Sequence, residues 1–383
     1  MRIGIDYRPA LQDSTGIGRY VRELVRAMIE LGFDDSLGLF GYTLAPMRFS
    51  KRELGLEGTR AELLRLRIPS RWLPKLMERT GRGADDLCGN ADVFQHTQYQ
   101  ALPVRRAAQV AMVFDCIYTL RGAGYVEDAT AERMTAAAKA LVQRSQRILV
   151  PTQYIGAEVV MALGAHPARV SVTELGCDHI VRDLPPEGFG RPSEPYVLTI
   201  ARVDPRKNHL RMLQAFEMLV REGLPHRWII GGPRGWRCED FERALANSPA
   251  KARVEWRAHV PDRDLPKLYA QADCFLFASL NEGFGLPPLE AMACGTPVVT
   301  SAVTSLPEVC GDAAFLVEPT DSERIFEAMR RVLTEPEIAT ELRTRGKIQA
   351  RKFTWRDCAK HTLLAYRNAT KAEEEPPALR KSL

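Results

Sequence analysis

The sequence predicts an α/β protein made of two doubly wound domains that face each other across a cleft. Short apolar runs alternate with longer amphipathic runs through both halves of the chain, which is typical of parallel strands covered by helices. The chain has 383 residues, enough for two or three domains of roughly 150 residues each. A stretch rich in proline and glycine, residues 182–195, interrupts the alternation and predicts a linker.

The first half begins with a strand and a helix. Residues 2–6 are a short apolar run, followed by a polar loop that contains Gly16 and Gly18. Apolar residues then recur at helical spacing up to Ile29, and Gly32 is a stop signal. Further strands are predicted over 110–114 and 147–150. We therefore expect an N-terminal Rossmann-like domain over residues 1–181.

The alternation restarts after the linker. It predicts strands at 196–200, 228–232, 274–277 and 297–300, and a helix at 209–221. This pattern predicts a C-terminal Rossmann-like domain over residues 196–365. The last segment, 366–383, is expected to be a helix end and a disordered tail, because it is rich in Lys, Glu and Pro.

Composition excludes several classes of protein. The net charge of +5, which is 53 basic minus 48 acidic residues, is too small to indicate nucleic acid. There is no apolar run of ~18 residues for a membrane helix, and the N-terminus becomes polar too early for a signal peptide. The nearest two of the eight cysteines are 16 residues apart, at 294 and 310, so no CxxC pair exists. We expect free thiols in the cytoplasm.

Residues 48–82 are the most basic part of the chain. They carry ten basic and four acidic side chains, an excess of +6, interleaved with leucines and Trp72. Such a segment suits peripheral contact with an anionic membrane or a phosphate-bearing lipid acceptor. It equally suits amphipathic helices, interrupted at Pro69 and Pro74, that pack on the first domain with a solvated basic face. The sequence leaves both interpretations open.

The strongest motif follows the strand predicted at 274–277. Glu282 lies in a loop with two glycines that allow backbone amides to approach a ligand closely. Pro287 and Pro288 suit the first turn of a helix, and Glu290 lies inside that helix. The N-terminus of such a helix favours anions or hydroxyl oxygens.

The pair Glu282 and Glu290 resembles the E-x7-E motif of retaining glycosyltransferases of GT-B family 4, also called glycosyl transferases group 1. The resemblance continues through residues 200–208, 294–299 and 306–309, and covers nearly all of the second half. It is weaker in the first half, mainly at residues 16–19. Among these enzymes the chain is most similar to bacterial mannosyltransferases of surface-polysaccharide assembly.

The resemblance implies a role for each candidate residue. Arg202 and Lys207 would grip the donor diphosphate and stabilise leaving-group charge, and Glu282 would accept hydrogen bonds from the donor sugar. The remaining donor contacts implied are the amides of Gly283, Phe284, Gly285 and Leu286 (sugar or phosphates), Glu290 (ribose), the backbone near His259 and Val260 (base), and Gly16 and Gly18 (diphosphate or acceptor).

One position departs from the family pattern. Many relatives carry His-Asp where this chain has Phe114 and Asp115, and the histidine there contacts the donor sugar. The resemblance therefore assigns the catalytic polar contact to Asp115. His96 also follows a predicted strand, and either a donor contact or a structural role suits it.

Residues 262–264 match the D-x-D string that a different glycosyltransferase fold uses for metal. An apolar helical pattern follows, so we interpret Asp262 as a helix N-cap and Asp264 as a first-turn acid. We therefore expect neither a metal nor a cofactor.

The sequence thus predicts a retaining hexosyltransferase that uses a nucleoside-diphosphate sugar. The resemblance favours GDP-mannose, with a UDP-sugar as the alternative, and a glycan or lipid-linked acceptor. Two rival hypotheses are an epimerase-like enzyme of the same fold and a catalytically silent sugar-nucleotide-binding protein, the second motivated by Phe114. We expect the protein in the cytoplasm, with peripheral contact at the inner face of the cell membrane through residues 48–82.

Overall fold

The computed structural model describes residues 1–374 apart from 13–15, 33–34, 70–71, 183, 186–187 and 191. The chain divides into two compact units. Unit 1 comprises Met1–Thr119, Ala129–Gly176 and Trp355–Leu383, and unit 2 comprises Leu120–Asp128 and Cys177–Thr354. The tail predicted to be disordered lies outside the described residues from 375 onward.

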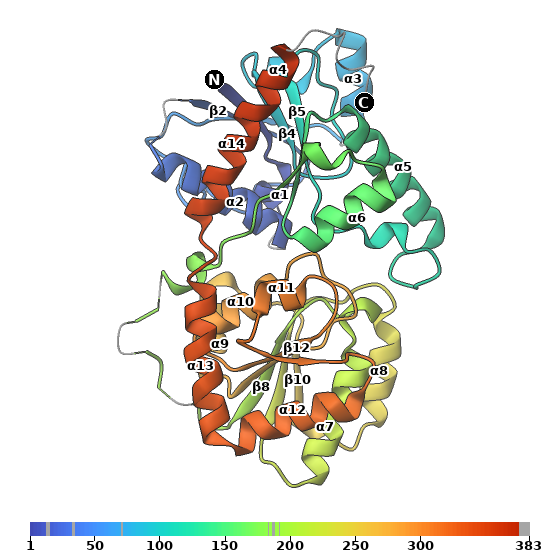
Figure 1. The fold of residues 1–383 in the computed structure, drawn as a ribbon, viewed down its shortest axis with the longest axis vertical. Coiled ribbons are helices and arrows are strands. Elements are labelled where there is room, and N and C mark those ends of the chain that lie inside the picture. The colour runs from blue at the N-terminus through green and yellow to red at the C-terminus, as the bar shows by residue number, and fades with distance from the viewer. Residues whose placement is uncertain are drawn as a thin grey trace. The chain divides into compact units, whose positions relative to one another are not determined.

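Unit 1 is built on a seven-stranded sheet in the order β3-β2-β1-β4-β5-β6-β7, with every pair parallel (Figure 1). Its strands are β1 (Arg2–Asp6), β2 (Ser36–Tyr42), β3 (Glu62–Leu66), β4 (Val93–His96), β5 (Ala108–Met112), β6 (Arg147–Val150) and β7 (Val170–Val172). Its helices are α1 (Arg8–Gln12), α2 (Gly16–Glu30), α3 (Leu73–Thr80), α4 (Ala84–Leu87), α5 (Asp128–Arg144), α6 (Gln153–Leu163) and α14 (Trp355–Glu374).

Unit 2 has a six-stranded parallel sheet in the order β10-β9-β8-β11-β12-β13. Its strands are β8 (Tyr196–Ile200), β9 (Arg227–Gly231), β10 (Val254–Arg257), β11 (Cys274–Phe277), β12 (Val298–Ser301) and β13 (Phe315–Val317). Its helices are α7 (His209–Arg221), α8 (Cys238–Asn247), α9 (Leu265–Gln271), α10 (Leu286–Ala293), α11 (Leu306–Cys310), α12 (Ser322–Thr334) and α13 (Pro336–Ala350).

The strand order of unit 2 decides which loops meet. The chain winds outward from β8 to β10 and then returns to β11 on the other side of β8. Right-handed crossovers place α7 and α8 on one face and α9 and α10 on the other. The loops after β8 and β11 therefore meet at the point where the winding reverses, which is where open α/β sheets bind ligands.

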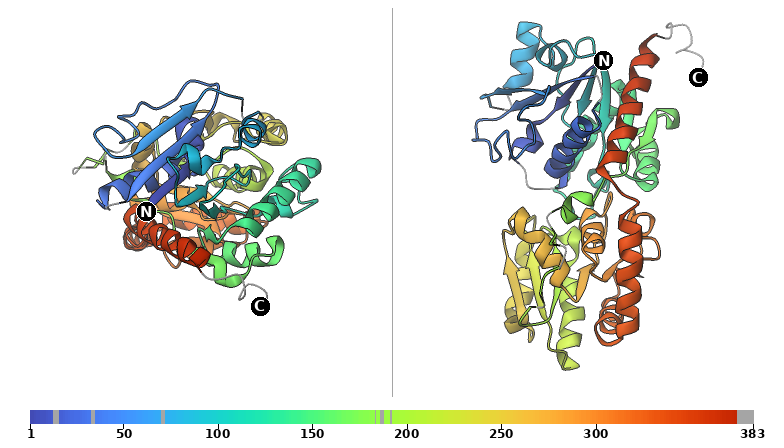
Figure 2. Two further views of the ribbon diagram at one scale, coloured as in Figure 1. Left: turned by 90° about the horizontal axis from the view of Figure 1, so that it is seen from above. Right: turned by 90° about the vertical axis from the view of Figure 1, so that its left-hand side faces the viewer.

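The C-terminal helix α14 packs on unit 1, although its sequence follows unit 2 (Figure 2). Trp355 and Tyr366 are completely buried there, and the Tyr366 hydroxyl donates to the side chain of Gln95. The division thus differs from the expected domain boundaries. Residues from Trp355 onward belong to unit 1, and the short segment Leu120–Asp128 belongs to unit 2.

The basic segment 48–82 has a mixed structure. Its central part forms the edge strand β3, which pairs with β2, whereas one of the two interpretations left open was a set of amphipathic helices. Among the described residues of the segment, α3 is the α-helix, and Pro74 lies in its first turn, where proline costs little because its missing N–H would have no helical partner. Arg71, one of the ten basic residues, lies outside the described part of the chain.

No helix in the described part of the chain combines the length and apolar character needed to span a bilayer. All eight cysteines are free thiols, as the sequence predicts.

Candidate functional site

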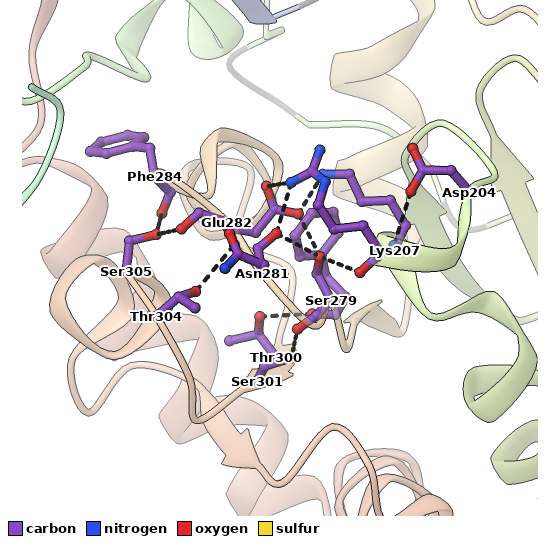
Figure 3. Close-up of polar contacts among 12 residues, drawn as sticks. Asp204, Lys207, Ser279, Asn281, Glu282, Phe284, Thr300, Ser301, Thr304 and Ser305 are labelled. Atoms are coloured by element: carbon purple, nitrogen blue, oxygen red, sulfur yellow. Dashed lines mark hydrogen bonds and ion pairs between the residues drawn. The ribbon is translucent and has the colours of Figure 1, made fainter. Parts of the chain in front are cut away.

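The loops that follow β8 and β11 bring Lys207 and Glu282 together in unit 2 (Figure 3). The Lys207 ammonium donates to Glu282 Oε1, and the Ser279 hydroxyl donates to the same oxygen at 2.6 Å. The other carboxylate oxygen accepts from Arg206 Nη1 at 3.1 Å. Glu282 is therefore held by two cations and a hydroxyl, although only 7% of it is exposed.

Electrostatics keep the Glu282 carboxylate ionised. Burial by itself raises its pKa, but the Lys207 ammonium and the Arg206 guanidinium outweigh burial and hold the pKa below its ordinary value. Burial, together with repulsion from Arg206, lowers the pKa of Lys207. A buried pair of this kind loses several kcal/mol when one partner is removed, of the order of 3–5.

Arg206 was not among the predicted site residues, and its guanidinium contacts the Glu282 carboxylate. Arg206 Nη1 also donates to the Asn281 carbonyl at 2.7 Å, which ties the two loops to each other. Arg202 is exposed and makes no polar contact with another described residue. The sequence signal that could have indicated Arg206 is its position next to Lys207. Two consecutive cations in the loop after a strand can contact more oxygen atoms of an anionic ligand than one cation can.

Several hydroxyl side chains hold the loop of Glu282 in place, and the sequence analysis did not single them out. Thr304 Oγ1 accepts from the Glu282 amide at 3.1 Å, and the Ser305 hydroxyl donates to the Glu282 carbonyl at 2.8 Å. The Ser301 hydroxyl donates to the Ser279 carbonyl at 2.6 Å. These bonds satisfy buried backbone groups in a loop that belongs to no strand or helix.

Gly283 to Leu286 lead into helix α10, which begins at Leu286. The N-cap Gly285 has φ 105°, and a Cβ at this position would lie 2.6 Å from the Leu306 side chain, so only glycine fits. No side chain caps this end of α10. Pro287 and Pro288 carry no N–H and the Leu289 amide donates to the Gly285 carbonyl, so the first turn of α10 offers the Leu286 amide to an anion.

Glu290 lies in the middle of α10 and is 1% exposed. Its two carboxylate oxygens lie 3.0 Å from His179 Nε2 and 2.8 Å from the Tyr269 hydroxyl. A ribose hydroxyl would therefore have to share or replace one of these partners. His179 and Tyr269 are positioning residues that the sequence motif did not reveal.

His259 and Val260 follow β10 and border a cavity of about 460 Å³ on the flank of unit 2. This cavity is also lined by Arg227, Glu255 and Arg257, and it contains neither Lys207 nor Glu282. His259 is exposed, while Val260 packs closely over Gly231. Their position after a strand end suits contact with a planar base through the backbone.

The expected D-x-D segment is a single turn. Asp262–Asp264 forms a 3-10 helix, and Asp264, rather than Asp262, is the N-cap of α9. Among the residues that the structure describes, no group of three or more His, Cys, Asp or Glu side chains is arranged to hold a metal.

The remaining predicted residues lie in unit 1. Gly16 and Gly18 occupy the first turn of α2, and Asp115 is half-buried just after β5. Phe114 packs edge-to-face on Tyr20, with ring centroids 5.0 Å apart. His96 is buried, with Nε2 3.2 Å from Gln109 Oε1, which fits the structural interpretation of this residue.

Comparison with known proteins agrees with this geometry. A family model described as Glycosyl transferases group 1 matches residues 184–353, and one described as Glycosyl transferase 4-like domain matches residues 15–176. O-antigen chain mannosyltransferase B of Escherichia coli is 31% identical to this chain, covering 96% of this chain and 100% of that protein. The chain belongs to the group 1 glycosyltransferases.

Solved structures show that this glycosyltransferase has the GT-B fold. Sucrose-phosphate synthase of Thermosynechococcus elongatus superposes with a TM-score of 0.75 at 20% identity, covering 97% of this chain and 100% of that one. Anabaena Alr3699/HepE in complex with UDP and glucose gives 0.73 at 16% identity, covering 95% and 98%. A second Escherichia coli relative, the serotype-specific mannosyltransferase WbdA, is 32% identical over 50% of this chain and 24% of its own length.

Proposed function

We propose that this glycosyltransferase transfers mannose, with retention of configuration, from GDP-mannose to a glycan or lipid-linked acceptor in surface-polysaccharide biosynthesis. The observation that carries the proposal is the buried cluster of Arg206, Lys207 and Glu282 beside the open N-terminus of α10. Its cations suit a diphosphate and its carboxylate suits sugar hydroxyls. The full-length likeness to an O-antigen chain mannosyltransferase favours mannose and a glycan acceptor.

In this mechanism the donor bond breaks between the anomeric carbon and the diphosphate oxygen. Lys207, Arg206 and the backbone amides of Gly283–Leu286 stabilise the negative charge that grows on the departing diphosphate. The acceptor hydroxyl attacks from the same face and gives its proton to a phosphate oxygen, so the products are a glycoside and the nucleoside diphosphate. Glu282 orients the sugar, Glu290 binds the ribose and Asp115 supplies a further polar contact.

A donor panel tests the proposal. Thermal-shift titration with GDP-, UDP-, dTDP- and ADP-sugars should select GDP-mannose, and NMR of the product should show the anomeric configuration of the donor. Glu282→Gln should abolish the donor-dependent shift. Glu337→Gln, which removes an exposed carboxylate from the first turn of α13 in the same unit, should not. Selection of another nucleotide, or an inverted product, would overturn the assignment.

Catalytic silence is the second candidate, because Phe114 replaces a histidine that relatives carry at this position. Slow release of GDP from GDP-mannose without an acceptor would reject it. Donor binding without turnover, over a panel of α-mannosides, would establish it.

We further propose that the enzyme works in the cytoplasm and that α3 contacts an anionic membrane. Trp72 and Leu76 are 56% and 45% exposed, and the basic side chains of Lys75 and Arg79 are exposed on the same helix. Exposed apolar groups beside cations favour anionic lipid headgroups. Trp72→Ala combined with Leu76→Ala should reduce co-sedimentation with phosphatidylglycerol vesicles. Equal binding of the variant, or of phosphatidylcholine vesicles, would overturn the contact.

A further inference from the structure

A second cavity in unit 2, of about 260 Å³, lies between the first turns of α7 and α8. The two helices pack against each other (Figure 1). Residues 123–125 form another wall of the cavity. They belong to the segment Leu120–Asp128, which lies between two segments of unit 1 in the sequence but is part of unit 2. None of the residues assigned above to the donor or to catalysis lines this cavity.

His209 lines this cavity and lacks the partners that a buried polar group requires. It is 2% exposed, and neither ring nitrogen has a hydrogen-bond partner among the described residues. Its ring packs on Phe241, with centroids 5.4 Å apart. Burial and the nearby Lys207 ammonium lower its pKa to about 3. A neutral imidazole offers one donor and one acceptor, so a ligand could satisfy both.

The other polar groups of the cavity are balanced in charge. Arg211 and Arg237 contribute two cations, and Asp204 and Asp240 contribute two carboxylates. Arg237 pairs with Asp240 at 3.1 Å. A phosphate would meet repulsion from both carboxylates, whereas a hydroxyl can donate to a carboxylate and accept from a guanidinium.

Backbone amides and aromatic rings complete the lining. The N-caps of α7 and α8 are Asn208 and Arg237, with φ 63° and 51°, and neither side chain caps its helix. The first-turn amides therefore remain as donors. Tyr125 and Phe241 are the aromatic residues that line the cavity, and aromatic faces provide an apolar surface for the C–H groups of a sugar ring. Cations, carboxylates, a neutral imidazole and aromatic rings together suit a polyol ring.

The cavity borders the loop that carries Arg206 and Lys207. Asp204, Pro205 and Asn208 flank Arg206 and Lys207 and also line the cavity. Leu280, another lining residue, donates from its amide to the Arg206 carbonyl at 2.8 Å. A ligand in this cavity would therefore lie beside the loops that are proposed to hold the donor.

We propose that this cavity is a saccharide subsite that holds one sugar ring of the acceptor glycan. The ring lies against Tyr125 and its hydroxyls bond to His209, Arg211 and Asp204. The assignment of the sugar to the acceptor rests on the proposed function, because a glycan-extending enzyme must hold the chain that it extends.

Binding without a donor tests the subsite directly. Titration of the full-length protein with α-mannobiose and α-mannotriose, followed by calorimetry and saturation-transfer NMR, should give binding that Tyr125→Ala and Arg211→Ala each weaken by about tenfold or more. Arg221→Ala is the matched control, because Arg221 is an exposed arginine at the other end of α7. Equal affinities for the wild type and Tyr125→Ala would overturn the proposal, and so would displacement of the sugar by millimolar inorganic phosphate.

Kinetics separate failure of the subsite from failure of the proposed function. In the wild type, kcat/KM for transfer should rise with the length of the α-mannoside acceptor. Tyr125→Ala should raise the KM of long acceptors by about tenfold and leave GDP release without acceptor unchanged. Transfer whose acceptor KM does not respond to Tyr125→Ala would sink the subsite alone. Tyr125-dependent sugar binding without transfer from any donor would sink the proposed function and support the subsite.

Discussion

The two units carry different kinds of side chains at the ends of their strands. In unit 2, Lys207, Arg206 and Ser279 surround the buried Glu282 carboxylate. In unit 1, the strand end at β5 carries Phe114, which packs on Tyr20, and the buried His96 keeps to a structural contact with Gln109. Unit 2 therefore carries a pre-organised charged cluster, whereas the strand end of unit 1 carries aromatic packing and one half-buried carboxylate, Asp115.

This contrast shows where strain and charge are concentrated. The charged cluster is stable because each member neutralises another in a place with little water. The aromatic cluster of unit 1 is stable because it removes apolar area from water. The same GT-B architecture thus supports two kinds of strand end. Substitutions in the charged cluster of unit 2 should reduce both activity and stability, whereas substitutions in the aromatic packing of unit 1 should mainly reduce stability.

Lys207→Ala should have the largest effect. It removes a cation that stabilises the leaving diphosphate and leaves Glu282 without its ammonium partner, so kcat/KM should fall by at least ~10²-fold. Steady-state release of GDP measures the loss, with Arg221→Ala as the control. A rate near that of the wild type would remove Lys207 from the site.

Phe114→Ala should lower the free energy of unfolding by about 2 kcal/mol, because a half-buried ring and its edge-to-face contact are lost. Urea denaturation measures the loss. The thermal shift produced by GDP-mannose should stay unchanged, since Phe114 supports unit 1. A stability close to that of the wild type would show that Phe114 serves ligand binding rather than the packing of unit 1. Phe114→His, which restores the residue of many relatives, sharpens the same test.

Acid should destabilise both units through buried histidines. Burial lowers the pKa of His96 to about 4 from an ordinary 6.5, so the unfolded chain binds the proton first as the pH falls. Stability is therefore lost between about pH 6.5 and pH 4, and His96 contributes about 2 kcal/mol of the loss between pH 7 and pH 5. His209 should act in the same way in unit 2.

Urea denaturation at pH 7 and pH 5 measures this loss. In His96→Gln the difference in unfolding free energy between the two pH values should shrink by about 2 kcal/mol. An unchanged pH dependence would show that His96 titrates normally in the folded protein.

Asp115→Asn should have a smaller effect on catalysis than Lys207→Ala, about tenfold in kcat/KM, because it preserves the shape and removes one charge. The comparison between the units breaks down if this variant loses as much activity as Lys207→Ala. Unit 1 would then contribute a full share of the charged site.

Removal of divalent metal ions should leave the transfer activity unchanged, which is the smallest effect that we predict. In the proposed mechanism Lys207, Arg206 and the backbone amides of Gly283–Leu286 supply the positive charge that a diphosphate needs. Transfer assayed with EDTA should match transfer assayed with added Mn²⁺ or Mg²⁺. A strict requirement for a divalent ion would contradict the interpretation of residues 262–264 as a simple helix start.

Local patterns determined much of this protein. Short apolar runs placed the strands 2–6, 147–150, 196–200 and 274–277, and helical spacing placed the helix 209–221, at the bounds that the structure has. The resemblance of the Glu282 to Glu290 motif to one family was also correct, because a strand, a glycine loop and a helix with proline in its first turn occupy consecutive residues. These features depend on neighbours along the chain, so the sequence displays them directly.

Tertiary structure alone decided the rest. His179 lies 111 residues from its partner Glu290, and Thr304 lies 22 residues from its partner Glu282. No spacing rule indicates such contacts, whereas Arg206 is the neighbour of Lys207 in sequence. Helix α14 and residues 120–128 pack on the unit other than the one their sequence position suggests. The physical reason is that burial and charge pairing act through space. A segment therefore packs on whichever unit buries its apolar side chains and pairs its charges, wherever the segment lies in the sequence.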